Sequence, residues 1–263
     1  MKQRNTARLL TGRIYVGLVL FFLYAPILVM ALMSFNASEF YAFPLSFTLG
    51  WYAKLANNAE IVSSAWRSLW IAIATTIIAA SLGTAASLAL FRYEFPGKRI
   101  LQALLFPPIA IPWLIVGTAM LIFFFWVGIG RGTPAVILGH VALALPYVIV
   151  VVSARLQTFD RQLEEAARSL GASQWEVTRY VTLPWIASGV VAGALFAFAV
   201  SFDQFVVSYF LAEPGDATLP VIIYTAIRKG FTPEINAIST IIIVISMAVM
   251  LGASRFFKFG GER

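Results

Sequence analysis

Residues Glu164–Pro184, EEAARSLGASQWEVTRYVTLP, form a polar and charged segment between two long apolar runs, and this segment decides how the chain is organised. Glu164–Arg168 consists of residues that are compatible with a helix, and Gly171 interrupts them. Trp175–Tyr180 can form a second short helix, which Pro184 is expected to stop because proline lacks a backbone N–H. The segment predicts a helix–turn–helix that lies between membrane spans and offers a docking surface to another protein.

The composition places most of the chain in lipid. Of its 263 residues, 60% are hydrophobic and 12% are charged, whereas soluble domains carry about 25% charged residues. Such a chain cannot hide its apolar surface from water by folding on itself, so the bilayer must be one of its solvents. There is no cysteine, which excludes disulfides, thiolate metal sites and a cysteine nucleophile.

Hydropathy predicts an all-α integral membrane protein with six transmembrane helices. Each apolar run reaches the roughly 20 residues that cross the hydrocarbon core. In the third run, Pro107, Pro108 and Pro112 should kink the helix, either beside a transport pathway or as a purely structural bend. The predicted spans are Ile14–Phe35, Trp66–Phe91, Ile100–Trp126, Pro134–Ala154, Trp185–Leu211 and Ile235–Phe257.

The basic residues predict the orientation of these spans. Fourteen of the 19 lysines and arginines fall in the two termini and in the second and fourth loops, which share one side of a six-span topology. By the positive-inside rule, both termini and the Glu164–Pro184 segment are cytoplasmic. The net charge of +7 is therefore explained by the orientation of the spans in the membrane and does not indicate nucleic acid binding. The first apolar run is longer than a signal-peptide core and lacks a cleavage site, so we expect an uncleaved anchor.

Small residues mark candidate helix contacts. In the fifth span Gly189 and Gly193 form a G-x-x-x-G pattern, which permits close approach of two membrane helices. Packing within one bundle and packing against another subunit both fit this pattern, and we expect the former. No repeat or linker divides the chain, so one membrane domain is predicted.

Patterns of catalytic residues are nearly absent. The single histidine, His140, lies within the fourth predicted span and is expected to be a hydrogen-bonded packing residue. No nucleophile elbow, H-E-x-x-H or EF-hand pattern occurs. Gly97-Lys98 lacks the other residues of a P-loop, so we expect no ATP site, cofactor or metal on this chain. An intramembrane enzyme remains only a distant alternative.

The cytoplasmic segment resembles the EAA motif of ABC importer permeases. Glu165-Ala166-Ala167 is followed by three residues, Gly171, nine residues and then Val181-Thr182-Leu183-Pro184, where the family has Ile-x-Leu-Pro. The resemblance implies a MetI-like, type I permease fold. It divides the chain into residues 1–60 (tail, first span and outer loop), the permease core 61–256 with its EAA loop at 160–184, and a cytoplasmic tail, 257–263.

The same resemblance implies a mechanism that suits a chain without a P-loop. In this family the EAA loop forms coupling helices that dock on a separate ATPase dimer, which holds the ATP and Mg²⁺. Glu165 would accept hydrogen bonds from a basic group of the ATPase, unless it merely pairs with Arg168 on the surface. The residues implied in coupling are Glu164, Glu165, Ala166, Ala167, Gly171, Ala172, Leu183 and Pro184.

The second half of the chain resembles the spermidine/putrescine branch of these permeases, specifically its PotC-like subunit. The resemblance rests on SFDQFVVSYFLAEPG at 201–215 and on TLPVIIYTAIRKGFTPEINAISTIII at 218–243. A polyamine could lie against Asp203, with aromatic faces offering cation–π contacts, whereas Arg228 or Lys229 would be structural partners of Asp203. Polyamine members have two adjacent acids here, and this chain has Gln204 at the second. The residues implied in the substrate pathway are Asp203, Gln204, Trp113, Trp126 and Tyr147.

Other cargoes and one other class of transporter stay open at this point. Related permeases carry other amino-containing solutes, such as opines or aminophosphonates. A secondary transporter or channel driven by an ion gradient would also use intramembrane acids and prolines. The resemblance implies a bacterial cytoplasmic (inner) membrane protein with three kinds of protein partner. These are the ATPase dimer, an extracytoplasmic solute-binding protein and a second permease, either identical or a PotB-like heterodimer partner.

Overall fold

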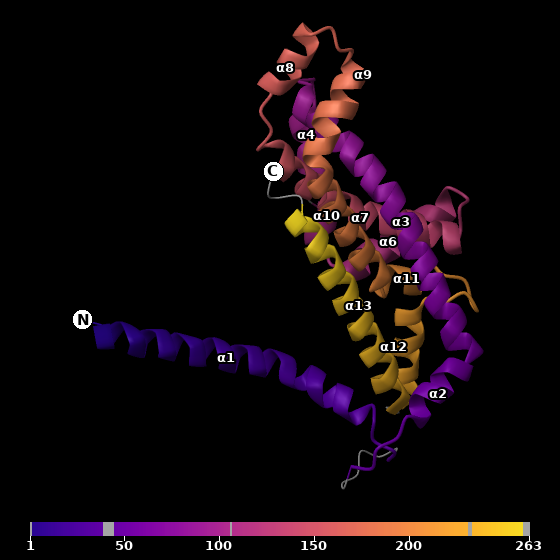
Figure 1. Ribbon diagram of the computed structural model, residues 1–263. Coiled ribbons are helices and arrows are strands. Elements are labelled where there is room, and N and C mark those ends of the chain that lie inside the picture. The colour runs from indigo at the N-terminus through magenta and orange to yellow at the C-terminus, as the bar shows by residue number, and fades with distance from the viewer. Residues whose placement is uncertain (1, 39–44, 106, 231–232, 260–263) are drawn as a thin grey trace. The chain divides into compact units, whose positions relative to one another are not determined.

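The computed structural model describes residues 2–38, 45–105, 107–230 and 233–259, and these residues are almost entirely helical (Figure 1). One isolated antiparallel bridge joins Asn36 and Phe47. The chain forms two compact units. Of the described residues, the first unit comprises those in 2–62 and 223–259, and the second comprises those in 63–222.

In the first unit, two long apolar helices accompany a short one. These are α1 (Lys2–Met33), α2 (Gly50–Asn57) and α13 (Pro233–Phe259), with most of α12 (Leu219–Lys229). Lys54 of α2 forms an ion pair of 3.1 Å with Glu234 at the start of α13. The Trp51 indole N–H donates to the carbonyl of Asn36 at 2.8 Å. The predicted outer loop therefore contains a helix, although part of the loop (39–44) lies outside the described residues.

The second unit holds the sites discussed below. Its long helices are most of α3 (Ala59–Arg92), α7 (Thr133–Leu156) and α10 (Leu183–Phe202), and α10 packs along α7. Its shorter elements are α4 (Lys98–Leu105), α5 (Pro107–Ala110), α6 (Trp113–Trp126), α8 (Gln162–Ser169), α9 (Gln174–Val177), the π-turn η1 (Thr178–Thr182) and α11 (Val206–Leu211).

Within the part of the chain that the structure describes, four helices are long and apolar enough to cross a membrane, and together with shorter apolar helices they confirm the predicted all-α membrane fold. The four segments are Gly12–Met33, Ala59–Arg92, Thr133–Leu156 and Gln174–Phe202. The shorter ones are Trp113–Trp126, Leu219–Arg228 and Pro233–Ala248. The first, second, fourth and fifth predicted spans thus correspond to these four segments and the sixth to α13, whereas the third is divided.

The predicted third span, Ile100–Trp126, is interrupted at the prolines where a break in hydrogen bonding and a kink were predicted. It is divided into α4, α5 and α6, with α5 beginning at Pro107 and α6 beginning after Pro112. Proline cannot donate to the preceding turn and its ring crowds the carbonyl four residues earlier, so three prolines within six residues break the helix outright. The sequence identified the residues responsible and underestimated their effect.

Pro184 does not end the second helix of the polar segment, contrary to prediction. α9, η1 and α10 form one continuous helical segment from Gln174 to Phe202. Within η1 the backbone N–H of Leu183 bonds to the carbonyl of Thr178, five residues back. This wider turn makes room for the proline ring and its missing N–H, so the helix passes through Pro184 into the membrane span.

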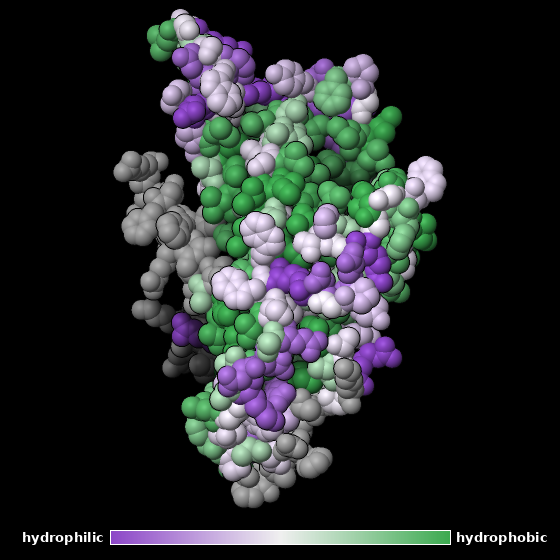
Figure 2. Space-filling view, turned by 90° about the vertical axis from the view of Figure 1, so that its right-hand side faces the viewer, coloured by the Kyte–Doolittle hydropathy of each residue, from purple (hydrophilic) through white to green (hydrophobic). Residues whose placement is uncertain are grey.

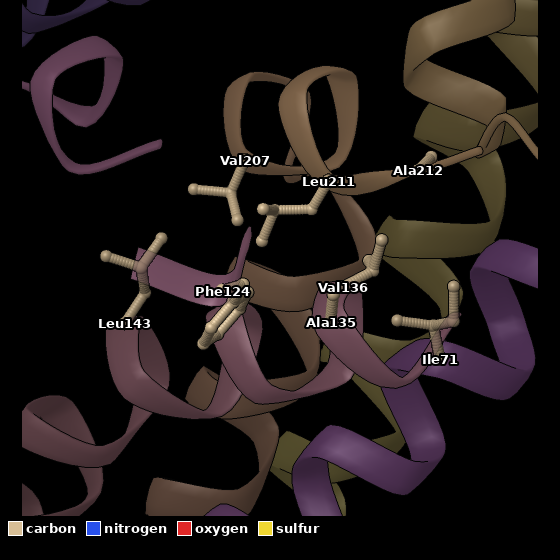
Figure 3. Packing of buried hydrophobic residues seen from close by; sticks show 8 residues of the cluster. All are labelled: Ile71, Phe124, Ala135, Val136, Leu143, Val207, Leu211 and Ala212. Carbon is tan, nitrogen blue, oxygen red and sulfur yellow. The ribbon is translucent and has the colours of Figure 1, made fainter. Parts of the chain in front are cut away.

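Two apolar clusters hold the second unit together. Figure 3 shows the first, in which Val207 and Leu211 of α11 project toward Phe124 of α6. The second lies between α7 and α10. The first cluster consists of Ile71, Phe124, Ala135, Val136, Leu143, Val207, Leu211 and Ala212. The second cluster consists of Ala79, Ala144, Val148, Val152, Leu156, Ile186 and Ala197.

The G-x-x-x-G pattern packs within the bundle, as expected. A Cβ atom added to Gly189 would lie 2.8 Å from Cβ of Arg155 on α7, and one added to Gly193 would lie 3.2 Å from Cγ1 of Val148. Both glycines are buried. These contacts let the backbones of α7 and α10 approach closely.

Replacing Gly189 with leucine is therefore expected to destabilise the α7–α10 contact by about 1–3 kcal/mol, because the added side chain must displace α7. Ala187→Leu is the matched control, since Ala187 is exposed on the same helix. Thermal melting of the detergent-purified protein, followed by size-exclusion chromatography after heating, compares the two. Equal melting temperatures would contradict the assigned packing.

Candidate functional site

The polar segment forms two short helices joined by a glycine turn. In Figure 1, α8 and α9 lie together at one end of the second unit. Gly171 has a φ of +91°, in the left-handed region. The N–H of Gly171 bonds to the carbonyl of Arg168 at 2.9 Å, and that of Ala172 to the carbonyl of Ala167 at 3.1 Å. This pair of bonds is the Schellman ending of a helix, for which glycine is the preferred residue.

A capping box starts the second helix. The Ser173 hydroxyl accepts from the N–H of Glu176 at 3.3 Å, and the Glu176 carboxylate accepts from the N–H of Ser173 at 2.7 Å. Hydrogen bonds from the Ser173 side chain and backbone lower the pKa of Glu176. The S-x-x-E spacing is a known signature of a helix start and would have placed α9 from sequence. The box fixes the angle at which the chain leaves the Gly171 turn.

The tip of the segment exposes large apolar side chains. Leu170 is 90% exposed, and Trp175 and Tyr180 are also exposed. Glu165 and Ala166 are exposed beside them. Figure 2 shows hydrophilic side chains gathered at the end of the molecule that carries α8 and α9, beyond a mainly hydrophobic band. Apolar side chains exposed in a polar setting are typical of a protein-binding surface.

Glu164, in contrast, points inward. Its side chain is 5% exposed and its carboxylate accepts from Arg92 Nη2 at 2.6 Å, Thr182 Oγ1 at 2.6 Å and Arg168 Nη2 at 3.2 Å. Burial raises the pKa of this carboxyl, but the Arg92 and Thr182 hydrogen bonds and the nearby positive charges outweigh it, so the pKa lies below its ordinary value. The alternative pair between Arg168 and Glu165 is therefore wrong, because Arg168 pairs with Glu164.

A second polar site lies where the predicted fifth span breaks between α10 and α11. Asp203 caps the end of α10 and is exposed. Gln204 is buried, and its Oε1 accepts from the N–H groups of Val206 at 3.1 Å and Val207 at 3.4 Å. The Gln204 amide thus supplies acceptors to the first turn of α11. The predicted continuous span Trp185–Leu211 is wrong in this part.

His140 bridges the two sides of this break. Its Nδ1 lies 2.8 Å from Ser201 Oγ on α10, and its Nε2 lies 2.9 Å from Ser208 Oγ on α11. The side chain is buried. The prediction of a hydrogen-bonded packing histidine is confirmed.

The aromatic residues predicted to line a substrate pathway do not converge. Trp113 and Trp126 occupy opposite ends of α6, which places them about 20 Å apart along the helix axis. Tyr147 stacks on Phe196 with the ring centroids 5.5 Å apart. The alternative partner Arg228 lies near the ring of Tyr224, and the side chain of Lys229 lies outside the described residues. Trp113 and Trp126 therefore cannot contact a small solute at the same point, and the assignment of the five residues to a substrate pathway stays a prediction.

An outer loop of the second unit borders an open surface cavity that the sequence did not predict. The cavity has a volume of about 410 Å³. The loop is fastened to α3, because Arg67 pairs with Asp216 at 2.8 Å and donates to the carbonyl of Ala217 at 3.0 Å. Ser68 accepts from the N–H of Leu219 at 2.8 Å. The lining residues are Leu121, Arg131, Ser208, Tyr209, Phe210, Ala212, Glu213, Pro214, Gly215, Ala217 and Val221.

Comparison with known proteins agrees with this arrangement. Residues 79–259 match the family described as "Binding-protein-dependent transport system inner membrane component". The chain is 35% identical to the spermidine/putrescine transport system permease protein PotC of Escherichia coli (strain K12) over 246 residues, 94% of this chain and 93% of that protein. It is 36% identical to the putrescine transport system permease protein PotI of the same strain over 229 residues, 84% of this chain and 82% of that protein.

A solved structure supports the fold. A chain of a bacterial ABC transporter involved in the import of the acidic polysaccharide alginate superposes with a TM-score of 0.76 at 13% identity, covering 96% of this chain and 97% of that chain. The resemblance to ABC importer permeases and to their spermidine/putrescine branch is thereby confirmed, and the homologues are transport subunits, not enzymes. The chain belongs to the binding-protein-dependent inner membrane component family, and it is a membrane-embedded permease subunit of an ABC importer.

Proposed function

We propose that this permease serves an importer of polyamines, with putrescine and spermidine as its substrate class. The observation that carries the proposal is the 35–36% identity to PotC and PotI over most of the chain. The exposed carboxylate of Asp203, at a helix break within an apolar bundle, supports a cationic cargo. The alginate importer shares the fold at low identity, so the fold itself does not choose between cations and anions.

The proposal includes a division of labour between proteins. This chain forms half of the pathway in the bacterial inner membrane, beside a second, PotB-like permease. An extracytoplasmic binding protein delivers the solute, and a separate ATPase dimer holds ATP and Mg²⁺. The family match and the orientation inferred from the basic residues support this assembly.

The docking surface for the ATPase is proposed to be the exposed side of α8 and α9. Glu165, Ala166 and Leu170 are exposed there, and Gly171 supplies the turn between the helices. Ala167 and Ala172 are half-buried at the base of that turn. Leu183 packs against the cluster between α7 and α10, and Pro184 follows it inside the continuous helix. These last two residues would therefore position the loop from behind.

Uptake by the complete transporter, reconstituted in liposomes with its ATPase and binding protein, tests the substrate. We expect saturable, ATP-dependent uptake of radiolabelled putrescine or spermidine. An opine and an aminophosphonate serve as comparison solutes. Uptake of either comparison solute with none of the polyamines would overturn the substrate assignment, and ATP-independent uptake by this chain alone would favour an ion-driven transporter.

A further inference from the structure

Glu164 is the buried residue of α8, and it lies where three elements meet. Its Oε1 receives hydrogen bonds from Arg92, the last residue of α3, and from Thr182 at the end of η1. Its Oε2 receives one from Arg168 on its own helix. A single carboxylate thus joins the cytoplasmic end of one long helix, the base of another and the short helix that carries the docking surface.

The Arg92 guanidinium completes the junction. Its Nη1 donates to Thr178 Oγ1 at 2.8 Å, and its Nη2 donates to Thr182 Oγ1 at 2.8 Å as well as to Glu164. Each threonine hydroxyl also donates a hydrogen bond. Thr178 donates to the carbonyl of Gln174, and Thr182 donates to the carboxylate of Glu164. Both terminal nitrogens of Arg92 are thereby hydrogen-bonded, whereas its buried Nε has no hydrogen-bond partner among the described residues, and the planar guanidinium holds the contacts in a fixed geometry.

The π-turn provides the threonines in the required position. Thr178 and Thr182 are the first and last residues of η1, and both hydroxyls contact the same guanidinium. This turn is also the point where the docking segment becomes the membrane helix α10. Any movement of the segment relative to α3 must therefore break the Arg92 contacts or carry α3 with it.

A second contact fastens the start of α8 to the same place. The Arg161 guanidinium lies 4.4 Å from the centroid of the Phe91 ring and donates to the Phe91 carbonyl. Phe91 and Arg92 are adjacent at the end of α3. Both the start and the middle of α8 are thus attached to α3.

The neighbouring glutamates have opposite environments. Glu165 is exposed on the docking side, whereas Glu164 is enclosed by Arg92, Arg168 and Thr182. A buried ion pair adds little net stability compared with apolar packing, and its common benefit is to specify one geometry. We therefore assign the Glu164 contacts to holding α8 in a fixed position relative to α3 and η1, and not to raising the stability of the fold.

We propose that Glu164 is a positioning residue that ties the docking helix α8 to the ends of α3 and α10, so that displacement of α8 by the ATPase moves both helices together. This inference rests on the proposed docking of the ATPase at α8 and α9. Glu165 and the exposed tip bind the partner, and Glu164 transmits the motion.

The test compares Glu164→Gln with Glu165→Gln in the complete reconstituted transporter. Three quantities are measured: co-purification of the ATPase, ATP hydrolysis and solute uptake per ATP hydrolysed. We expect Glu164→Gln to retain the ATPase and its hydrolysis, while uptake per ATP falls by about tenfold or more, since a lost coupling free energy of ordinary size has that effect. Glu165→Gln should instead reduce co-purification.

A conformational measurement separates this role from a purely structural one. The chain has no native cysteine, so Tyr93→Cys and Ser169→Cys, both at exposed positions, can carry spin labels. With Glu164 present, the distance distribution between the labels should be unchanged by ATP. With Glu164→Gln it should shift or broaden on ATP binding.

Three outcomes would overturn the proposal. They are normal uptake per ATP in Glu164→Gln, an unchanged label distance in that variant, or loss of ATPase binding equal to that of Glu165→Gln. If Glu164→Gln fails to accumulate in the membrane, Thr182→Val removes one donor at nearly constant volume and is subject to the same criteria. Absence of ATPase binding by the unaltered chain would instead refute the proposed docking function.

Discussion

Gly171→Val is expected to abolish transport while leaving the protein in the membrane at its normal abundance. Gly171 has a φ of +91°, a region that costs ordinary residues roughly 1–2 kcal/mol and β-branched residues more. Valine would therefore unwind the turn between α8 and α9 and displace the docking surface. The measurement is uptake by the full transporter, normalised to the amount of permease detected in the membrane.

Gly171→Asn is the matched variant, because asparagine tolerates a left-handed conformation. No atoms other than its chain neighbours lie within 4 Å of a Cβ added at Gly171, so a side chain has room in the isolated chain. Recovery of transport with asparagine would assign the defect to backbone conformation. Equal loss in both variants would mean that bulk at the docking surface is the cause. Normal transport in Gly171→Val would refute the docking assignment.

Leu170→Asp is expected to weaken binding of the ATPase by about 10–100-fold. Leu170 is 90% exposed, and burying a leucine side chain against a partner contributes about 1.5–3 kcal/mol, which corresponds to that range in affinity. A carboxylate in place of leucine would lose this apolar burial and would be costly to bury against the partner without a paired charge. Co-purification of the ATPase at a series of salt concentrations measures the change.

Ser169→Asp controls for the added charge, since Ser169 is exposed next to Leu170 on the same helix. Leu170→Met, which keeps an apolar side chain of similar size, should bind the ATPase normally. If Ser169→Asp weakens binding as strongly as Leu170→Asp, the effect is electrostatic and Leu170 is no anchor.

The sequence predicted the helix–turn–helix of Glu164–Pro184 well, except for the helix stop at Pro184, because its signals are local. The spacing from Glu165 to Gly171 and on to Leu183-Pro184 depends on neighbours along the chain, and Gly171 has the backbone conformation that its residue type suggests. The sequence could not tell which of the two adjacent glutamates faces inward. That choice depends on Arg92, which lies 72 positions earlier in the chain.

The membrane spans were predicted less well wherever backbone hydrogen bonds are rearranged. Hydropathy registers apolar length, so it joined α4, α5 and α6 into one span and α10 and α11 into another. The breaks at Pro112 and Gln204 depend on how freed N–H groups find acceptors. At Gln204 the acceptor is a side chain two and three residues before the N–H groups that it serves. At Pro184 a wider turn keeps the helix intact, which no residue-by-residue propensity anticipates.

Helix α3 is attached to other parts of the second unit at both of its ends. At one end Arg67 and Ser68 hold the loop that borders the outer cavity, and at the other Arg92 holds the Glu164–Pro184 segment. The two ends are separated by about 37 Å of helix, and the intervening sequence contains no proline. Because α3 has no proline kink, an axial or tilting displacement of one end is expected to displace the other end as well. We therefore expect the loop at 212–219 to move together with the Glu164–Pro184 segment, which is attached to the opposite end of α3.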